Sequence, residues 1–579
     1  MNLGALARKV TVAHALSIAV ALAVAVRVGP SIDSGASKRL LLGVVAVGLA
    51  FSLLRGRRAL LVPSGGGLFL AWVGWSLTSI VVSPRAAAAP VAVLWVSAAA
   101  LALGLSARGL SVARAVTIGA GTLLGVAVAG HVVVSFATGA RGLFLEGAQG
   151  NPNWAGLVLA TAVPIAIEGL RRARGPSRLA LGLGVAAMAT SLGLTHARVA
   201  WVALAVAALV TLVASRRVGG ARTRALSFAA VTLLVVIGAL LARTHAHVVA
   251  TKKATTTPTS TYEAPAELAI SGRLSIARIG LSAARKHAPL GAGLGGFSNA
   301  FLEAQGEALA SLPPSKAARA FVAAETAHDD YVQVLVETGP LGLLLLVAAG
   351  LATLRAQKNP GLRAAFVVLA VGALGDSPLR LPALVAMLAL LVAATPTRAA
   401  PRAFGRTERL VVVGAAALAL AFAVRARIAD HLVARAELEP EHRVALLGRA
   451  VRVDPWSAEA TLRLGLARLD AGDALVAVSV LRRARLLEVS VAGELALAGA
   501  WDAVGDRAAA EVATRRALGL HPGSFRGWLD LASLLRARGM LDDATRALEA
   551  ARSILPHHPA IEVVRTEIAE ASLEQVSAD

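Results

Sequence analysis

The amino-acid sequence predicts an all-α protein: a polytopic membrane helix bundle of about 12–13 spans with a long outer loop, followed by an α-solenoid. Three observations predict this. Of the 579 residues, 56% are hydrophobic, and the mean hydropathy of +0.68 exceeds what a soluble protein carries. Apolar runs recur along the first 424 residues. Beyond them the sequence becomes charged and rich in Ala and Leu, with an internal repeat.

Thirteen apolar runs are long enough to cross, or nearly cross, a bilayer. Together they predict a membrane domain over residues 1–424. The runs are Val12–Val28, Leu40–Leu54, Gly66–Val82, Pro90–Ser106, Ala115–Ala137, Trp154–Leu170, Leu179–Thr195, Val199–Ala214, Leu226–Leu241, Gly339–Leu354, Leu362–Leu374, Leu381–Ala394 and Leu410–Val424.

The basic residues predict the orientation of these spans. The formal charge of +23 comes largely from Lys and Arg in short loops, where they meet lipid headgroups, so nucleic acid is not an expected partner. Alternate loops are rich in Arg, which predicts a cytoplasmic amino terminus by the positive-inside rule. A bacterial chain of this kind would lie in the inner membrane, with its long loop in the periplasm.

The long loop covers about residues 242–328 and is the longest polar break in the apolar part, which indicates a functional segment. Within it, Lys252–Pro265 is rich in Thr, Ser and Pro and is expected to be a flexible linker. The glycine-rich segment Pro289–Phe297 lacks the Lys-Ser/Thr of a phosphate-binding loop, so we expect a tight turn packed on the membrane surface.

The segment 437–579 carries the repeat. Asp454, Glu488, His521 and Leu555 follow one another at spacings of 34, 33 and 34 residues, and each stands at a break between helical units. Helix, glycine turn, helix and a proline-type break at this period resemble the tetratricopeptide repeat. Such a solenoid offers a surface for a protein partner, and nothing in it has a catalytic pattern.

A predicted helix start follows the loop. Thr326, with Asp329 three residues later, has the spacing of a helix cap and would place His328 in the first turn. There the free N–H groups favour a bound anion and hold an imidazole in its neutral, proton-accepting form. A polar residue marking the water boundary of a helix is the plainer interpretation of this histidine taken alone.

Other candidates gather in the outer segments and favour an anionic substrate. They are Asn151 and Asn153 before the sixth run, Arg198 after the seventh, and Arg273 and Arg278 in the loop. Guanidinium groups bind phosphate oxygens with paired, charge-assisted hydrogen bonds. Each arginine has a plainer interpretation as a headgroup or solvated helix charge.

Metal and thiol chemistry find little support. The chain has no Cys and no cluster with metal-ligand spacing. The adjacent Asp329 and Asp330 are expected to be helix-start charges rather than metal ligands. Asp376 and Arg380, four residues apart, are expected to pair with each other at a membrane edge.

Two segments together resemble one known family. The turn Pro-Leu-Gly-Ala-Gly-Leu-Gly-Gly-Phe (Pro289–Phe297) follows an Arg-bearing helix, and His-Asp-Asp-Tyr-Val-Gln-Val-Leu-Val-Glu-Thr-Gly (His328–Gly339) follows the loop. With many spans and the long loop, they resemble the superfamily of O-antigen ligases, O-antigen polymerases and protein O-oligosaccharyltransferases. The similarity is firmest over Gly272–Gly342.

The resemblance implies a glycosyltransferase that moves a glycan from an undecaprenyl-diphosphate carrier to an acceptor hydroxyl at the periplasmic face, with no cofactor and no metal. It gives His328 the place of the essential histidine, Arg273 that of a loop arginine at the diphosphate, and Arg198 that of an arginine after the seventh span. We expect Arg198 and Arg278 to bind the diphosphate together with Arg273. Asn151, Asn153, Asp329 and Glu337 would support the site. Asp329 departs from the family pattern, which commonly has Asn or a small polar residue after the histidine.

The acceptor stays open between a lipid A core, as in lipopolysaccharide assembly by a ligase, another glycan, as in a polymerase, and a protein. Two other classes of function are a polyisoprenoid-glycan transporter and a membrane-anchored repeat scaffold. A transporter predicts charges in mid-span and broken helices in matched halves. A scaffold predicts that the repeats alone do the work.

Overall fold

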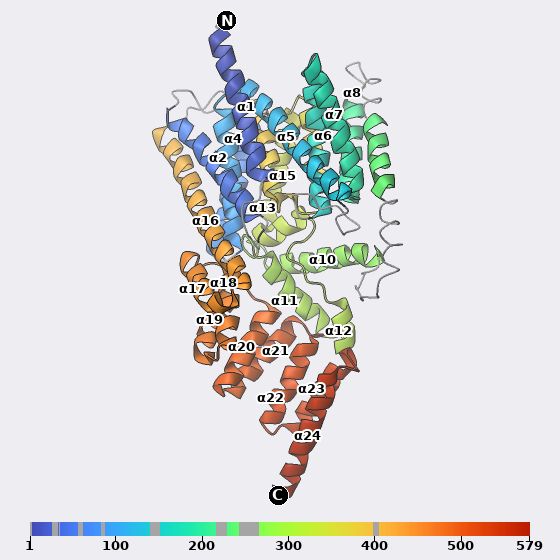
Figure 1. Cartoon of the computed structure of the whole chain (residues 1–579), viewed down its shortest axis with the longest axis vertical. Helices are drawn as coiled ribbons and strands as arrows, with labels where there is room; N and C mark the ends of the chain where they lie inside the picture. Colours follow the sequence, from blue (N-terminus) through green and yellow to red (C-terminus); the bar gives the residue numbers. More distant parts are fainter. Residues whose placement is uncertain are drawn as a thin grey trace.

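The computed structural model describes residues 3–25, 33, 35–55, 62–82, 87–138, 151–215, 229–242, 266–397 and 405–578. Every regular element in these ranges is a helix, which confirms the predicted fold class. Figure 1 shows a bundle of helices at the amino-terminal end, helices of the loop below it, and a stack of helix pairs that extends to the carboxyl terminus.

The described apolar helices correspond to the thirteen predicted runs. Seven of them are long and apolar enough to span a membrane, and six are shorter. Proline at the first turn of several, and Asn side chains that cap α6 and α14, define where these helices begin. Their bounds are α1 Leu3–Ala25, α2 Ala36–Arg55, α3 Gly66–Val82, α4 Ala88–Ser106, α5 Leu110–Ala137, α6 Pro152–Arg172, α7 Pro176–Leu194, α8 Arg198–Ser215, Ala229–Ala242, α13 Asp330–Ala356, α14 Pro360–Gly372, α15 Pro382–Ala393 and α16 Arg406–Leu438.

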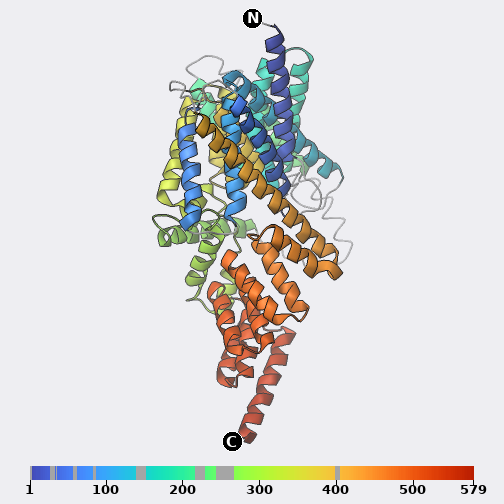
Figure 2. The ribbon, with the colours of Figure 1, turned by 90° about the vertical axis from the view of Figure 1, so that its left-hand side faces the viewer.

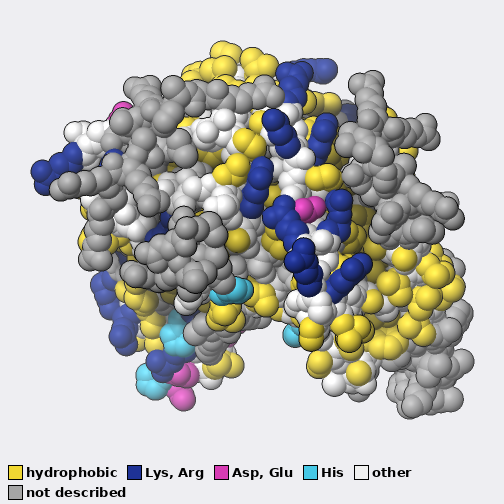
Figure 3. Space-filling model, turned by 90° about the horizontal axis from the view of Figure 1, so that it is seen from above, with side chains coloured by type: hydrophobic (Ala, Val, Ile, Leu, Met, Phe, Trp, Pro, Cys, Tyr) yellow, Lys and Arg dark blue, Asp and Glu magenta, His cyan; other side chains and the backbone are white. Residues whose placement is uncertain are grey.

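The centre of the bundle is formed by α4, α6 and α15. All twelve residues of α15 are buried, and so is 78% of the spanning window of both α4 and α6. Because α6 runs through this centre, the side chains at its two ends lie at opposite faces of the membrane domain. At one of these faces, seen from above in Figure 3, Lys and Arg side chains gather in a band over the bundle.

The outer loop contains three described helices: α10 Ala266–Lys286, α11 Phe297–Leu309 and α12 Pro314–Ala320. In Figure 1, α10 lies across the end of the bundle, and α11 and α12 extend toward the repeats. The predicted linker Lys252–Pro265 lies outside the described residues. Ile276, Ala283 and Ala284 of α10 share a small core with Phe297, Phe301 and Val336, which attaches the loop to α13.

The glycine-rich turn packs on a kink in α13, as predicted for a tight turn. Gly339 has φ of 69° just before Pro340, so α13 bends there. Ala292 and Gly293 donate backbone hydrogen bonds of 2.7 and 2.9 Å to the carbonyls of Val336 and Glu337. A Cβ at Gly339 would stand 2.0 Å from the carbonyl oxygen of Pro289, so only glycine fits this contact.

The repeats begin inside the last membrane helix. Figure 2 shows α16 continuing from the bundle into the stack, across the boundary predicted between residues 424 and 437. The Ala429–Ala436 part of α16 already belongs to the core of the first repeat. The pairs then follow at the predicted period: η3 Pro440–His442, α17 Arg443–Val453, α18 Ala458–Asp470, α19 Ala474–Leu487, α20 Val491–Val504, α21 Arg507–Leu520, α22 Phe525–Ala537, α23 Leu541–Ile554 and α24 Pro559–Ala578.

The loop helices dock on the repeats. Asn299 of α11 accepts a 3.2 Å hydrogen bond from the backbone N–H of Val489. The ring of Phe321, after α12, stacks on His521 with centroids 3.6 Å apart. A Cβ at Gly523 would stand 2.1 Å from the backbone nitrogen of Ala318. The repeats therefore hold the segment of the loop that leads to His328.

Candidate functional site

His328 lies just before α13 rather than in its first turn. The residue that caps α13 is Asp329, whose carboxylate accepts hydrogen bonds from Tyr331 N at 2.9 Å and Val332 N at 3.1 Å. The prediction that Thr326 caps this helix was therefore wrong, and so was the helix-dipole argument for His328. An Asp at the cap competes well with Thr because it accepts both orphan N–H groups. His328 has φ of 50°, a left-handed conformation that is uncommon outside glycine.

Asp376 faces His328 across the site. Its Oδ1 atom lies 4.0 Å from Nδ1 of His328, and the exposed fractions of the two side chains are 3% and 40%. The histidine Nδ1 is buried without a hydrogen-bond partner, whereas the rest of the ring is open to solvent. A buried carboxylate beside an accessible imidazole is the arrangement in which the carboxylate orients the ring and the ring exchanges protons with a substrate.

The expected pairing of Asp376 with Arg380 was wrong. Arg380 forms its ion pair with Glu337 instead. The four-residue spacing brings two side chains together only on an α-helix, and this segment is a loop followed by the 3₁₀ turn η2, Pro378–Arg380.

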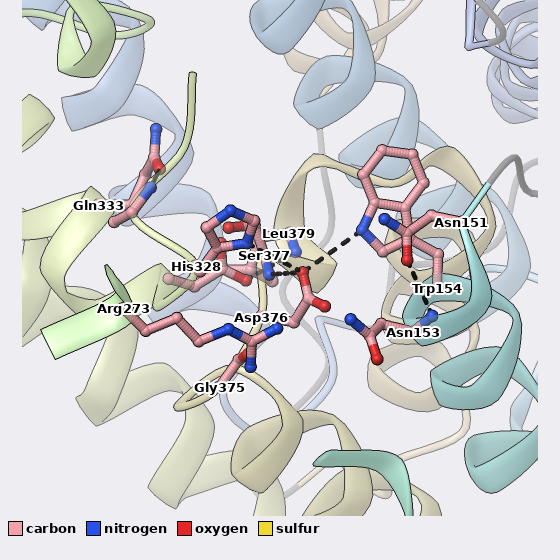
Figure 4. A network of polar contacts seen from close by, with 12 residues as sticks. Asn151, Asn153, Trp154, Arg273, His328, Gln333, Gly375, Asp376, Ser377 and Leu379 are labelled. Atoms are coloured by element: carbon pink, nitrogen blue, oxygen red, sulfur yellow. Dashed lines mark hydrogen bonds and ion pairs between the residues drawn. The ribbon is translucent and has the colours of Figure 1, made fainter. Parts of the chain in front are cut away.

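Trp154 and the backbone hold Asp376 in place. The Oδ1 atom accepts hydrogen bonds from Trp154 Nε1 at 3.3 Å and from Ser377 N at 2.8 Å. Trp154 belongs to the first turn of α6, where Asn151 caps the helix by accepting a 2.8 Å hydrogen bond from Asn153 N. Figure 4 shows the Asn153 side chain pointing toward Asp376. Asn151 thus has a structural role, and Asn153 lines the site.

Arg273 reaches the same loop from α10. Its Nη1 atom donates a 2.9 Å hydrogen bond to the carbonyl of Gly375, next to Asp376. In Figure 4 its guanidinium lies beside Asp376 and below His328. The other guanidinium N–H groups are then placed to meet an anion at the imidazole.

The other two predicted arginines are placed differently. Val199 packs against Gly375, because a Cβ built there would lie 2.9 Å from Val199 Cγ2, so the first turn of α8 adjoins the site. Arg198 therefore begins α8 beside this loop, with an exposed side chain. Arg278 is exposed on α10 and lies five residues from Arg273, about 140° around the helix, so it faces elsewhere.

A second buried network fixes the loop to α13. Asp330 is 1% exposed, and its Oδ2 atom accepts a 2.7 Å hydrogen bond from Leu379 N. Glu337 is 2% exposed and accepts a 2.8 Å hydrogen bond from Gln333 Nε2 in addition to its ion pair with Arg380. Glu337 therefore joins the segment of Arg380 to α13.

Asp329, where the sequence departs from the family pattern, uses its carboxylate to cap α13. Burial raises the pKa of Asp329 above its usual value, and this effect outweighs the hydrogen bonds from Val332 and Tyr331, which lower the pKa. Its carboxylate points into the helix start, so it acts on His328 mainly by fixing the backbone that follows. Over the described residues, no group of three or more His, Cys, Asp or Glu is arranged to hold a metal ion.

The sequence analysis missed Asp376 and Trp154 as site residues. One signal was available, since Asp376 is the only acidic residue between Glu337 and Glu408 and stands between two apolar runs. An acidic residue at a membrane edge invites a functional interpretation. The expected ion pair with Arg380, four residues later, gave Asp376 a structural role instead, and this pair does not form.

Part of the chain is similar to a known family model. Residues 183–347 match the family model described as O-antigen ligase, a segment that includes Arg198, Arg273 and His328. No curated protein matches the chain. Among solved structures, MamA is 22% identical over 26% of this chain and 85% of its own, with a TM-score of 0.23. Yeast Tom70 is 12% identical over 73% of this chain and 91% of its own, also with a TM-score of 0.23.

The Cut9–Hcn1 hetero-tetramer is 12% identical over 79% of this chain and 92% of that chain, with a TM-score of 0.24. Scores this low support no argument, so the repeats are identified from their own helix pairs and their period of 33–34 residues. The chain is a multi-pass membrane protein whose residues 183–347 are similar to the O-antigen ligase family model and whose carboxyl end folds into tetratricopeptide-like helical repeats.

Proposed function

We propose that this protein transfers a glycan from an undecaprenyl-diphosphate carrier to an acceptor hydroxyl at the periplasmic face of the bacterial inner membrane. The acceptor oxygen attacks the anomeric carbon of the glycan and inverts its configuration. The bond from that carbon to the diphosphate oxygen breaks, and undecaprenyl diphosphate leaves with the bonding electrons. The observation that supports this most strongly is the convergence of His328, Asp376 and Arg273 from three separate segments.

His328 is the general base of this reaction. Its Nδ1 atom faces Asp376, which leaves Nε2 to take the proton of the acceptor hydroxyl as the oxygen attacks. Asp376 is a positioning residue, because it selects the tautomer with the proton on Nδ1 and stabilises the imidazolium that forms. The distance of 4.0 Å is longer than a hydrogen bond, and such contacts commonly tighten once substrate is bound.

Arg273 and Arg198 hold the diphosphate. Guanidinium groups stay protonated and bind phosphate oxygens in pairs, so they stabilise the charge that accumulates on the leaving group. The hydrogen bond from Arg273 to Gly375 fixes one end of its guanidinium beside the histidine. Arg198 is exposed at the start of α8 and is free to turn toward a bound diphosphate. We expect no metal in this step, and transfer should persist in the presence of a chelator.

The decisive experiment replaces His328 with alanine in the full chain. We expect His328→Ala to lower the rate of transfer from a purified lipid-linked glycan by about 10²–10⁴-fold, the usual contribution of a general base. His557→Ala, at an exposed site in the turn between α23 and α24, is the matched control and should transfer at the normal rate. Normal transfer by His328→Ala, with the variant inserted in the membrane, would overturn the proposal. The assay offers lipid A core, glycan and protein acceptors in parallel.

The cysteine-free chain permits a clean test of the orientation. Lys286→Cys places one thiol at the end of α10, the helix that carries Arg273, and Arg355→Cys places one in the last turn of α13, at the opposite face of the membrane domain. A membrane-impermeant maleimide added to intact cells should label the first variant and spare the second. The reverse result would place the site on the cytoplasmic side and contradict the proposal.

A further inference from the structure

A groove runs between the end of α6 and the beginning of α7. Its lining is Leu170, Gly175, Arg178, Leu179, Gly182 and Leu183. The candidate site adjoins the first turn of α6, and the 21 residues of this helix span about 31 Å at 1.5 Å per residue. The groove therefore lies about one membrane thickness from the site, at the face seen in Figure 3.

Two glycines keep the groove open. A Cβ at Gly182 would meet only Leu170 Cδ1, at 4.0 Å, and a Cβ at Gly175 would meet nothing within 4 Å. Leu179 and Leu183, one turn apart on α7, are 69% and 64% exposed. Since they belong to an apolar span, the side chains that they present to the outside meet lipid and not water. The groove thus has the apolar lining on which an acyl chain can lie.

Positive charge gathers beside this groove. Arg178 lines it, one turn before Gly182 on α7. Arg171 and Arg172 in the last turn of α6, and Arg174 in the connecting turn, are exposed beside it. Glu168 is the acidic partner described here, and it lies 2.8 Å from Arg172 and 3.7 Å from Arg171. Two of the four guanidinium groups have this one carboxylate as a partner, which leaves an excess of positive charge beside the groove.

We propose that this groove binds an anionic phospholipid of the surrounding membrane, with its phosphate on Arg178 and its acyl chain over Gly182. Charge complementarity favours a phosphate, because a guanidinium binds it with short, charge-assisted hydrogen bonds. The apolar lining favours a lipid over a soluble anion, which would leave the groove along Leu179 and Leu183 empty. A lipid seated there bridges α6 and α7, and α6 carries Trp154, which holds Asp376, at its other end.

The proposal is tested on the detergent-solubilised full chain by native mass spectrometry, with dioleoyl phosphatidylglycerol as the anionic probe and dioleoyl phosphatidylcholine as the neutral one. Arg178→Gln removes the phosphate contact, and Gly182→Leu fills the groove without meeting backbone. Each should weaken the binding of phosphatidylglycerol by about tenfold, as expected for the loss of one charge-assisted contact or of the chain's seat.

Two matched control variants distinguish a specific lipid-binding groove from general electrostatic attraction of anionic lipid to this face. Arg355→Gln removes an exposed arginine from the same face, and Gly74→Leu adds a side chain to an exposed glycine of α3 that has no neighbour within 4 Å. Both should bind phosphatidylglycerol as the parent chain does. Three results would overturn the proposal: equal weakening by Arg355→Gln, unchanged binding in Arg178→Gln and Gly182→Leu, or equal binding of phosphatidylcholine.

Discussion

The charged residues of the candidate site and those of the repeats are paired differently. In the repeats, many pairs join neighbours on one helix, as in Arg515 with Glu511 and Arg526 with Asp530, each four residues apart. Others join neighbouring helices, as in Arg538 with Glu511. At the site, partners are buried and distant in the chain. The hydrogen bond from Arg273 to Gly375 spans 102 residues, and the ion pair of Arg380 with Glu337 spans 43.

Ion pairs within one helix form wherever that helix forms, whereas pairs between distant segments form only when the whole domain folds. An exposed pair four residues apart on a helix contributes about 0.3–0.5 kcal/mol, so evolution can gain or lose it freely. A charge buried in a membrane domain costs several kcal/mol of desolvation, so buried charges occur mainly where they are paired or functional. Asp376 and Glu337 are buried carboxylates of this kind near His328, and Glu494, with Arg485 and Arg516 beside it, is one in the repeats.

The largest expected effect tests whether Asp376 acts through His328. Asp376→Asn should lower the transfer rate by about 10³–10⁴-fold, because an amide can stabilise the wrong tautomer of the imidazole. The measurement is the pH dependence of transfer, which should lose the part due to His328 while the affinity for donor stays near normal. Asp454→Asn, which removes the partner of Arg425 in the repeats, is the control and should transfer normally. A normal pH profile in Asp376→Asn would mean that Asp376 is only structural.

The buried ion pair should dominate stability. Glu337→Ala leaves Arg380 without its partner in a largely buried setting, and we expect a loss of about 3–5 kcal/mol of stability. Arg526→Ala removes one member of an exposed pair and should cost less than about 1 kcal/mol. Thermal unfolding of both purified variants measures the contrast. Equal shifts in the two would show that the site pair and the repeat pair are energetically alike.

A third change addresses the contact between the loop and the repeats. A Cβ at Gly523 meets the backbone of Ala318 at 2.1 Å, so Gly523→Ala should push the loop off the repeats and lower transfer severalfold. Gly519→Ala, in the same repeat, adds a methyl group with no neighbour within 4 Å and should be neutral or slightly stabilising. Protease sensitivity of residues 310–330 reports the release directly. If Gly523→Ala transfers glycan as well as Gly519→Ala does, the repeats do not position the loop.

The smallest expected effect is a pH dependence of that same contact. Burial lowers the pKa of His521 from 6.5 to about 4. Between these two values the undocked form binds more protons than the docked form. The stability that the neutral ring contributes is therefore present above pH 6.5 and lost as pH falls toward 4. Limited proteolysis of the loop should become faster as pH falls from 6.5 to 4. His521→Phe keeps the stacking on Phe321 and should flatten the dependence; a persistent dependence would assign it to another group.

The sequence alone determined the apolar spans and the period of the repeats, and the resemblance of two segments to a known family singled out His328 and Arg273 as candidates. The spans and the repeats are local properties: a run of apolar residues fixes its own helix in a bilayer, and a 34-residue period fixes a stack of helix pairs. The polar segment between the ninth and tenth runs likewise marked the loop from composition alone.

Only the tertiary structure decided which polar groups meet. Asp376 and Arg380 are close in the chain, yet one turns to His328 and the other to Glu337, because a 3₁₀ turn replaces the helix that would have paired them. The helix α13 begins three residues later than the sequence predicted, so Asp329 caps it instead of Thr326. Spacing along a chain fixes contacts within a helix, but contacts between helices depend on how the whole bundle packs, and the site is made of the latter.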